Sequence, residues 1–527
     1  MLLKTILLTV LSTYLLASSI SLEFLKSKPK SFARDFYILE YMKQDISQDE
    51  LEAAYSLVKR KNSKLFKEYA KKTKKQDVKN KAKCQKISAK SIIKLSPSCI
   101  VEGLNYKKAA VLSNKELMQV SKKLKTKDRL KSKTFYAMSR KDVFGYILKR
   151  NNTFFELFNN SYRSYKVKHL NKTIPLKYLN RLSTDKRFNK SIELIVANPV
   201  YDNLQNSLLN VNPKNQNFRA TFLLGVNAIR LGYEVKALEF FDKALKKAYY
   251  QMDKDNIYFW QYLITKEQKY IDILNKSWDI NMYSVIARQK SRIPFDNIYS
   301  SHCSSIKKPS IDILDPFAWI DIQKENKDLE KRVKAFKSCD ELPHKAVFET
   351  KLNNYKKHFY VQPYKEHLMG VDPKRKALIY AIARQESRFI PASISHSYAL
   401  GMMQFMPFLA RATAKELEIK NFQLTDMFKP NIGYKFADHH LDYLEKHLEH
   451  PLYISYAYNG GIGFTTRMLK EDYFKNKKYE PYLSMELVPY KESRRYGKKV
   501  IANYVIYAGL LGEDLNLENI LNELIKE

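Results

Sequence analysis

The chain has 527 residues and a mass of 62.0 kDa, which is long enough for two to four domains. It holds only 13 glycines and 17 prolines, too few for the tight turns that hairpin-rich sheets require. No stretch shows sustained period-two alternation, whereas short helical periods recur along the chain. The predicted fold class is therefore all-α.

The formal charge is +38, and it is unevenly distributed. Residues 371–527 hold 22 lysines and arginines against 19 aspartates and glutamates, whereas residues 1–370 hold 71 against 36. Such a field would attract nucleic acid, an anionic membrane surface or an acidic polymer. The lysines are scattered and not grouped into a patch with interleaved aromatics, which favours solvated helix faces without a specific partner.

The first 24 residues read MLLKTILLTVLSTYLLASSISLEF. One early lysine, an apolar run from Ile6 to Ala17 and small residues beyond it predict a secretory signal peptide over residues 1–19, with cleavage after Ser19. The run is short for a transmembrane span, so we expect no integral membrane span, and a retained anchor is the alternative. We predict an exported protein of the periplasm or cell envelope, which argues against a nucleic-acid partner.

Four cysteines fit an exported protein, because an even count in an oxidising compartment usually means disulfides. Three pairings are possible. Sequence neighbours favour Cys84 with Cys99 and Cys303 with Cys339. None of the four has the C-x₂-C spacing of a zinc site, so we predict no metal site.

Residues 20–300 contain many short helical periods separated by polar residues. Helices of that length cannot bury an apolar face alone, so we expect them to stack in pairs. The clearest pair lies in 218–250, where Phe241 is accompanied by recurring small residues: Gly225, Ala228, Gly232, Ala237 and Ala244. This spacing resembles a tetratricopeptide-like repeat, in which small residues let two antiparallel helices approach closely. We predict an α-helical superhelical domain, an irregular solenoid, over residues 20–300.

Between residues 301 and 354 the helical pattern loosens, because Pro309 and Pro316 interrupt it, and the second cysteine pair lies here. We assign 301–354 to a linker module. Further along, the net charge falls and glycine and methionine become more frequent. Residues 355–527 are therefore predicted to form a separate C-terminal domain.

Glu386 lies on the apolar stripe of a predicted helix in this domain. A step of four from Ile382 lands on Glu386, so its carboxylate faces whatever the helix packs against. Desolvation there would raise its pKa, as a general acid near neutral pH requires. Taken alone, Glu386 is better interpreted as an ordinary salt-bridged helix glutamate, because Arg384 and Arg388 flank it.

Four short motifs change that interpretation. They are ES at 386–387, GMMQ at 401–404 with MP at 406–407, AYNGG at 457–461, and ESRRY at 492–496. In this order they resemble the soluble lytic murein transglycosylase family, whose catalytic domain is lysozyme-like. The resemblance covers roughly residues 355–515, and the preceding part resembles the family's superhelical domain more loosely.

The resemblance implies a set of site residues. Glu386 would be the catalytic acid and base. Residues that match substrate-binding positions, or that read as substrate contacts, are Ser395, Gln404, Met406, Tyr458, Asn459 and Glu492; supporting residues are Ser387, Gly401, Arg494 and Tyr496. The hydroxyl of Tyr458 is expected near the catalytic carboxylate. The sequence departs from the family at Tyr398, where glycine is usual and where a tyrosine would narrow the sugar groove, at Leu400, and at Gly497, where valine is usual.

An ordinary glycosidase needs a second carboxylate, yet residues 388–410 contain no aspartate or glutamate. The family's chemistry, as the resemblance implies, makes this absence intelligible. Glu386 would protonate the glycosidic oxygen, the substrate's acetamido group would stabilise the developing charge, and Glu386 would then activate the sugar's 6-hydroxyl. The product would be a 1,6-anhydro-muramyl end, formed without water and without a cofactor.

The predicted function is thus an exported peptidoglycan lytic transglycosylase, whose partners are glycan strands and, through the solenoid, cell-wall synthesis proteins. A lysozyme-like hydrolase with Glu492 or Asp426 as second carboxylate is one alternative. A catalytically inactive scaffold that holds glycan is the other.

Overall fold

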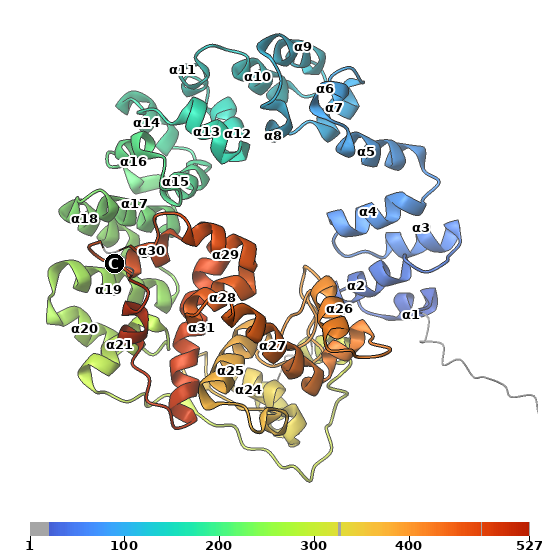
Figure 1. The fold of residues 1–527 in the computed structure, drawn as a ribbon, viewed down its shortest axis with the longest axis vertical. Helices are drawn as coiled ribbons and strands as arrows, with labels where there is room; N and C mark the ends of the chain where they lie inside the picture. Colours follow the sequence, from blue (N-terminus) through green and yellow to red (C-terminus); the bar gives the residue numbers. More distant parts are fainter. Residues whose placement is uncertain (1–19, 325–327, 476, 526–527) are drawn as a thin grey trace, which may run out of the picture. The chain divides into compact units, whose positions relative to one another are not determined.

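The computed structural model describes residues 20–324, 328–475 and 477–525. This part of the chain is mostly α-helical (Figure 1), so the predicted fold class is confirmed. Its only strands are β1 (Ile298–Tyr299) and β2 (His358–Phe359), which pair in parallel. None of its helices is long and apolar enough to cross a membrane. The predicted signal peptide lies outside the described residues.

The chain divides into two compact units. The first comprises residues 1–82, as far as they are described, with residues 394–398; the second comprises residues 83–393 and 399–527. The predicted borders near 300 and 354 fall inside the second unit and stay predictions.

The first unit consists of short helices, each begun by a side-chain N-cap from serine or asparagine. They are α1 (Leu22–Ser27), α2 (Phe32–Tyr41), α3 (Gln48–Ser56) and α4 (Ser63–Lys72), and α5 (Gln76–Lys86) crosses into the second unit. Tyr398 packs within this unit: it has a φ of 67° and is 1% exposed, and its hydroxyl accepts a 2.7 Å hydrogen bond from Asn62. The positive φ explains why glycine suits this position. The ring is buried within this unit, and the expectation that it narrows a sugar groove stays a prediction.

Helices of the second unit before residue 300 contact one another mainly between elements one to three places apart in sequence order, as in a solenoid. Their bounds are α6 (Ala89–Ile92), α7 (Pro97–Gly103), α8 (Tyr106–Ala109), α9 (Asn114–Leu124), α10 (Arg129–Met138), α11 (Val143–Leu148), α12 (Asn151–Asn160), α13 (Arg163–Leu170), α14 (Leu176–Ser183), α15 (Phe188–Val196), α16 (Asp202–Leu208), η1 (Pro213–Asn215), α17 (Phe218–Arg230), α18 (Glu234–Leu245), α19 (Gln251–Thr265), α20 (Gln268–Asn275) and α21 (Met282–Ser291).

The predicted repeat pair is present as α17 and α18, and its small residues permit close approach. A Cβ on Gly225 would lie 2.5 Å from Cε1 of the buried Phe241 ring. Gly232 forms the turn between the two helices with a φ of 83°. The predicted close contact of small and aromatic residues is therefore confirmed for this pair.

Gly225→Ala should destabilise the solenoid by about 1–3 kcal/mol, because overpacking against Phe241 outweighs the gain in helix propensity. Gly509→Ala is the matched control, since a Cβ there meets no atom within 4 Å and should stabilise by about 0.5–1 kcal/mol. Urea unfolding followed by circular dichroism measures both. Equal effects of the two substitutions would contradict the packing argument.

Both disulfides join the sequence neighbours, Cys84 with Cys99 and Cys303 with Cys339, as predicted. The second lies in the predicted linker module, which is better ordered than its sequence suggested. Buried Trp319, Ile322, Phe336 and Phe348 form a cluster there with Ile390 from beyond the module. Its elements are α22 (Pro316–Lys324), α23 (Leu329–Ala335), η2 (Cys339–Glu341) and α24 (Leu342–Leu352).

The C-terminal helices pack around α31 (Lys491–Leu510), which contacts both α25 and α28 along its length and is buried on nearly every side after residue 493. The other elements are η3 (Lys365–Leu368), α25 (Pro373–Ser387), α26 (Pro407–Glu416), η4 (Leu424–Phe428), α27 (Pro430–Glu445), α28 (Pro451–Gly460), α29 (Ile462–Leu469), α30 (Tyr482–Leu487) and α32 (Leu517–Asn522).

A buried polar cluster joins these helices to the solenoid helices α19 and α21, beside which α31 lies in Figure 1. Glu486 of α30 and Lys498 of α31 form an ion pair and are 3% and 4% exposed. Asn256 donates to the Glu486 carboxylate at 2.9 Å, and Tyr283 donates to it at 3.2 Å. Burial acts to raise the pKa of Glu486, but the Lys498 charge and these hydrogen bonds hold it below its ordinary value.

Lys498→Met should destabilise the protein by about 3–5 kcal/mol, because the Glu486 carboxylate is then buried without a counter-charge. Adding Glu486→Gln removes that charge and keeps a hydrogen-bond acceptor for Asn256 and Tyr283, so the double variant should recover most of the loss. Urea unfolding of the two variants measures the difference. A double variant as unstable as the single one would show that the charge pair is not the cause.

Candidate active site

Glu386 lies in the last turn of α25. The helix begins at Pro373 behind the N-cap Asp372, whose carboxylate accepts hydrogen bonds from two backbone amides. It ends where Arg388 and Phe389 both adopt left-handed conformations, with φ of 59° and 64°. Residues 377–384 are buried, whereas Glu386 is partly exposed, so its carboxyl group lies at the edge of the core and can be reached from solvent.

The Glu386 carboxyl group has one direct partner, the Tyr496 hydroxyl of α31, which donates to Oε1 at 2.7 Å. The pKa of Glu386 is raised to about 7: burial is the largest cause, the Tyr496 hydrogen bond acts in the lowering direction, and the negative charge of Glu492 contributes to the rise. A carboxyl with this pKa is substantially protonated near neutral pH. It can therefore give up a proton there and take one back.

A tight loop, residues 400–405, follows α25. Leu400 and Phe405 exchange backbone hydrogen bonds, and Gly401 has a φ of 74° with space for no side chain, since a Cβ would lie 2.0 Å from the Met427 carbonyl oxygen. Gln404 folds back on this loop: its amide nitrogen donates to the Gly401 carbonyl at 2.7 Å. The Gln404 amide nitrogen thus holds the loop, and its predicted contact with substrate stays a prediction.

Two hydroxyls fasten the same loop to its neighbours. Ser387 of α25 donates to the Met402 carbonyl at 2.8 Å, and Tyr458 of α28 donates to the Met403 carbonyl at 2.9 Å. Burial and the charge of Glu386 raise the pKa of Tyr458 well above its ordinary value, so this ring lies near the acid. The hydroxyl that bonds the carboxyl group, however, is that of Tyr496, which the sequence interpretation had treated as a supporting residue.

The AYNGG and ESRRY motifs meet where α28 packs on α31. Ser493 donates to the Asn459 side-chain oxygen at 2.8 Å. A Cβ on Gly497 would lie 2.3 Å from Cε1 of the Tyr456 ring, so only glycine fits at this position. This contact accounts for the departure from the family's usual valine.

The remaining predicted residues fall into different surroundings. Glu492 is exposed in the first turn of α31, and Met406 is partly exposed before α26. Arg494 is 2% exposed and donates to the Glu486 carbonyl at 2.8 Å, so it supports α30. Ser395 belongs to the first unit, where its hydroxyl accepts from the Ser397 amide at 3.3 Å. Sugar contacts by these residues stay predictions.

Asp426 and Glu492, the candidate second carboxylates of a hydrolase, differ in whether other residues already bind them. Asp426 is engaged, because it accepts from the Gln423 amide at 2.7 Å and pairs with Lys429 at 2.8 Å. Glu492 is the carboxylate whose charge reaches Glu386. Within residues 20–324, 328–475 and 477–525, no group of three or more metal-ligating side chains is arranged to hold an ion.

Sequence reasoning missed the Glu486–Lys498 pair. These residues lie on either side of the ESRRY motif, and their partners Asn256 and Tyr283 are more than 200 positions away in the chain. The helical spacing that puts Lys498 one turn from Ile501 and Ala502, on an apolar face, was the available signal.

Comparison with known proteins adds to this geometry. Residues 371–481 match the family described as "Transglycosylase SLT domain". A predicted soluble lytic murein transglycosylase of Haemophilus influenzae is 32% identical over 137 residues, 26% of this chain and 22% of that protein. The soluble lytic murein transglycosylase of Salmonella typhimurium is 29% identical over 135 residues, 25% of this chain and 20% of the relative. The chain thus spans about a fifth of the length of the curated relatives that it matches.

Solved structures are similar over more of the chain at lower identity. The 70 kDa soluble lytic transglycosylase of Escherichia coli is 15% identical, with a TM-score of 0.47 and coverage of 94% of this chain and 84% of the other. An inactive mutant of the lytic transglycosylase Slt of Pseudomonas aeruginosa is 13% identical, with the same TM-score and coverage.

Residues 371–481, which include Glu386, are therefore similar to the transglycosylase SLT domain and to soluble lytic murein transglycosylases, and the predicted resemblance is confirmed for this part of the chain.

Tyr496→Phe removes the hydroxyl that lowers the pKa of Glu386, so that pKa should rise above about 7 by about one pH unit. Infrared difference titration against Glu386→Gln follows this one carboxyl group. Tyr504→Phe is the matched control, since Tyr504 is buried on the same helix and its hydroxyl bonds to none of the described residues. A pKa that stays at about 7 in Tyr496→Phe would contradict the assigned contact.

Proposed function

We propose that the C-terminal domain is a peptidoglycan lytic transglycosylase, a carbon–oxygen lyase acting on polysaccharide. It cleaves the β-1,4 bond between N-acetylmuramic acid and N-acetylglucosamine without consuming water. The observation that carries this proposal is a single carboxyl group, Glu386, with a pKa of about 7, reachable from solvent and held by one tyrosine hydroxyl. The match of residues 371–481 to the transglycosylase SLT domain supports it.

In the first step Glu386 gives its proton to the glycosidic oxygen as the bond to C1 breaks. Because Tyr496 donates to Oε1, the proton to be transferred is carried by Oε2. The substrate's acetamido group stabilises the positive charge that develops at C1. Tyr496 at the same time stabilises the carboxylate that Glu386 becomes, since a hydrogen bond to a charged acceptor is stronger than one to a neutral acceptor.

In the second step the Glu386 carboxylate accepts the proton of the sugar's 6-hydroxyl as O6 bonds to C1. The 1,6-anhydro ring closes, and Glu386 returns to its starting protonation state. An intramolecular nucleophile competes with water through its high effective concentration. A single residue serves both steps because its pKa lies near neutral pH.

We also propose that the protein is exported to the periplasm or cell envelope. Two disulfides support an oxidising compartment. Glycan strands are the proposed partner, and binding of cell-wall synthesis proteins by the solenoid stays a prediction.

Glu386→Gln keeps the shape of the side chain and removes its proton, so murein cleavage should fall about 10³-fold. Glu449→Gln, at an exposed position in the same domain, should leave the rate unchanged. Release of soluble muropeptides from purified murein gives the rates. Full activity of Glu386→Gln would defeat every enzymatic interpretation and leave the glycan-holding scaffold.

Mass spectrometry of the same digests should show 1,6-anhydro-muramyl ends, which lack one water relative to hydrolysis products. Reducing muramyl ends would instead identify a hydrolase. Glu492→Gln then distinguishes its mechanism, since a second catalytic carboxylate would be indispensable for hydrolysis.

A further inference from the structure

A second pocket lies behind the helix that carries Glu386. Its volume is about 110 Å³, and its walls come from α25, α31, the residues that follow β2 and the loop before α21. From α25 it is lined by Arg384, Gln385 and Arg388, whereas Glu386 does not reach it. The two arginines lie two positions on either side of Glu386, which places them on the other side of the helix.

Positive charge predominates in this pocket. Arg384, Arg388 and Lys499 line it together with a single carboxylate, that of Asp279. His358 also lines it, but burial lowers the pKa of this imidazole, so it adds no charge at neutral pH. The pocket therefore holds an excess of cationic groups.

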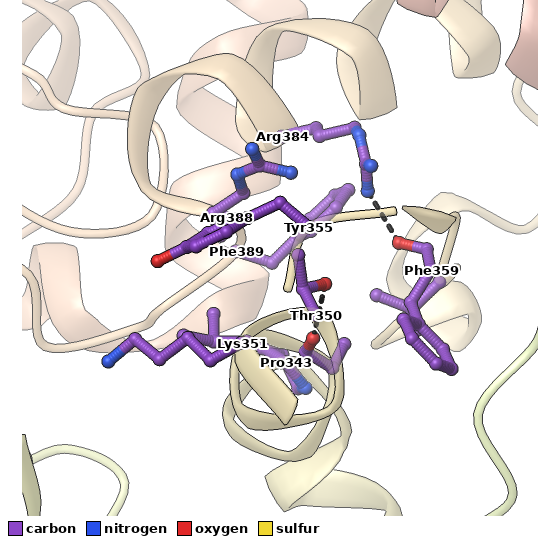
Figure 2. A pocket seen from close by; sticks show the side chains of 11 residues that line it. Pro343, Thr350, Lys351, Tyr355, Phe359, Arg384, Arg388 and Phe389 are labelled. Carbon is purple, nitrogen blue, oxygen red and sulfur yellow. Dashed lines mark hydrogen bonds between the residues drawn. The ribbon is translucent and has the colours of Figure 1, made fainter. Parts of the chain in front are cut away.

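Arg384 is already engaged by the protein. Its guanidinium is stacked 3.8 Å from the centre of the Tyr360 ring and donates to the Phe359 carbonyl at 2.5 Å. Figure 2 shows this bond from a neighbouring apolar pocket, which α24 helps to form, with the side chain of Arg388 beside that of Arg384. Arg384 thus contributes charge to the second pocket but few free donors.

The side chains of Arg388 and Lys499 have no hydrogen bond or ion pair with any residue that the structure describes. Each residue is exposed by its surface area, so its donors can be reached from solvent, but the surrounding elements lie close enough to both charged groups to desolvate them in part. Burial, and after it the charge of Arg384, lower the pKa of Arg388 to about 10. Burial and the charges of Arg495 and Arg388 lower the pKa of Lys499. Asp279 is the one carboxylate in the lining and offsets only part of this repulsion, so the excess of like charges raises the free energy of the empty pocket.

Neutral donors complete the pocket. The Tyr360 hydroxyl donates a 3.0 Å hydrogen bond to the side-chain oxygen of Asn503. The NH₂ group of the same amide is left to donate to a ligand. Gln385 supplies a second amide at the pocket wall. A guanidinium, an ammonium and two amides around a small cavity suit a compact group that only accepts hydrogen bonds.

We propose that this pocket binds an oxyanion head group, a carboxylate or a phosphate, between Arg388 and Lys499 with the amide of Asn503 as a further donor. If the proposed function is right, the free carboxylates of the peptides attached to murein are the natural source. Inorganic or esterified phosphate shares the same chemistry. The pocket volume admits such a head group and leaves the rest of a peptide outside.

The proposed anion site lies between the two helices that carry Glu386 and Tyr496. Arg388 directly follows the last turn of α25, and Lys499 lies three residues after Tyr496 on α31. An anion between them joins the two helices whose side chains form the Tyr496–Glu386 hydrogen bond. The bound anion therefore fixes the distance on which that contact depends.

Isothermal titration calorimetry at low salt tests the proposal with N-acetyl-alanyl-alanine, with its C-terminal amide and with inorganic phosphate. The acid should bind, the amide should not, and Lys499→Gln and Arg388→Gln should each weaken binding about 10-fold or more. Lys435→Gln, an exposed lysine on α27 of the same domain, is the matched control and should bind like the wild type.

Each outcome decides the matter in a different way. Binding of the peptide acid that is lost in both variants supports a peptide carboxylate as ligand, and binding of phosphate alone supports the phosphate source. Equal binding in the wild type and both variants, or no binding by the wild type, overturns the site. The titration involves no turnover, so anhydro products without anion binding would reject this site alone, and anion binding without anhydro products would reject only the proposed function. Melting curves of the variants check that they are folded.

Discussion

The hydrogen bond between Tyr496 and Glu386 is the contact on which the C-terminal domain depends. Burial raises the free energy of the ionised Glu386 carboxylate. The hydrogen bond from Tyr496 offsets part of that increase without placing a full positive charge beside the carboxylate. An arginine or lysine in its place would hold the acid ionised and unable to donate a proton. The phenol instead leaves the pKa at about 7, between that of an ordinary glutamate and that of a group too basic to act.

This contact ties remote parts of the chain to the chemistry, because Tyr496 belongs to a helix that other elements position. Lys498, two residues on, is held by Glu486 and by Tyr283 of the solenoid, and Gly497 between them allows α28 to approach. A solenoid helix therefore contributes to the position of α31, although none of its side chains bonds Glu386. In this respect the second unit behaves as one packed body.

Much of this could be predicted from local sequence. Helix spacing, the pair around Phe241 and the nearest-neighbour disulfides depend on residues close together in the chain, and each is present. The choice between Tyr458 and Tyr496 could not be made, because both tyrosines lie near the acid and the outcome depends on how α28 and α31 pack. The use of the Gln404 amide within its own loop likewise depends on a positive φ that no motif specifies.

The short parallel pair of β1 and β2 has a topological consequence. Ile298 and Tyr299 align with His358 and Phe359. The segment from residue 300 to residue 357 therefore begins and ends at the same two-stranded pair. The intervening segment has its own disulfide and supplies every member of its buried cluster except Ile390. A segment whose two ends meet one strand spacing apart can change in length, or be exchanged for another, while the helices on either side keep their register. It forms a natural point at which such a chain gains or loses a module.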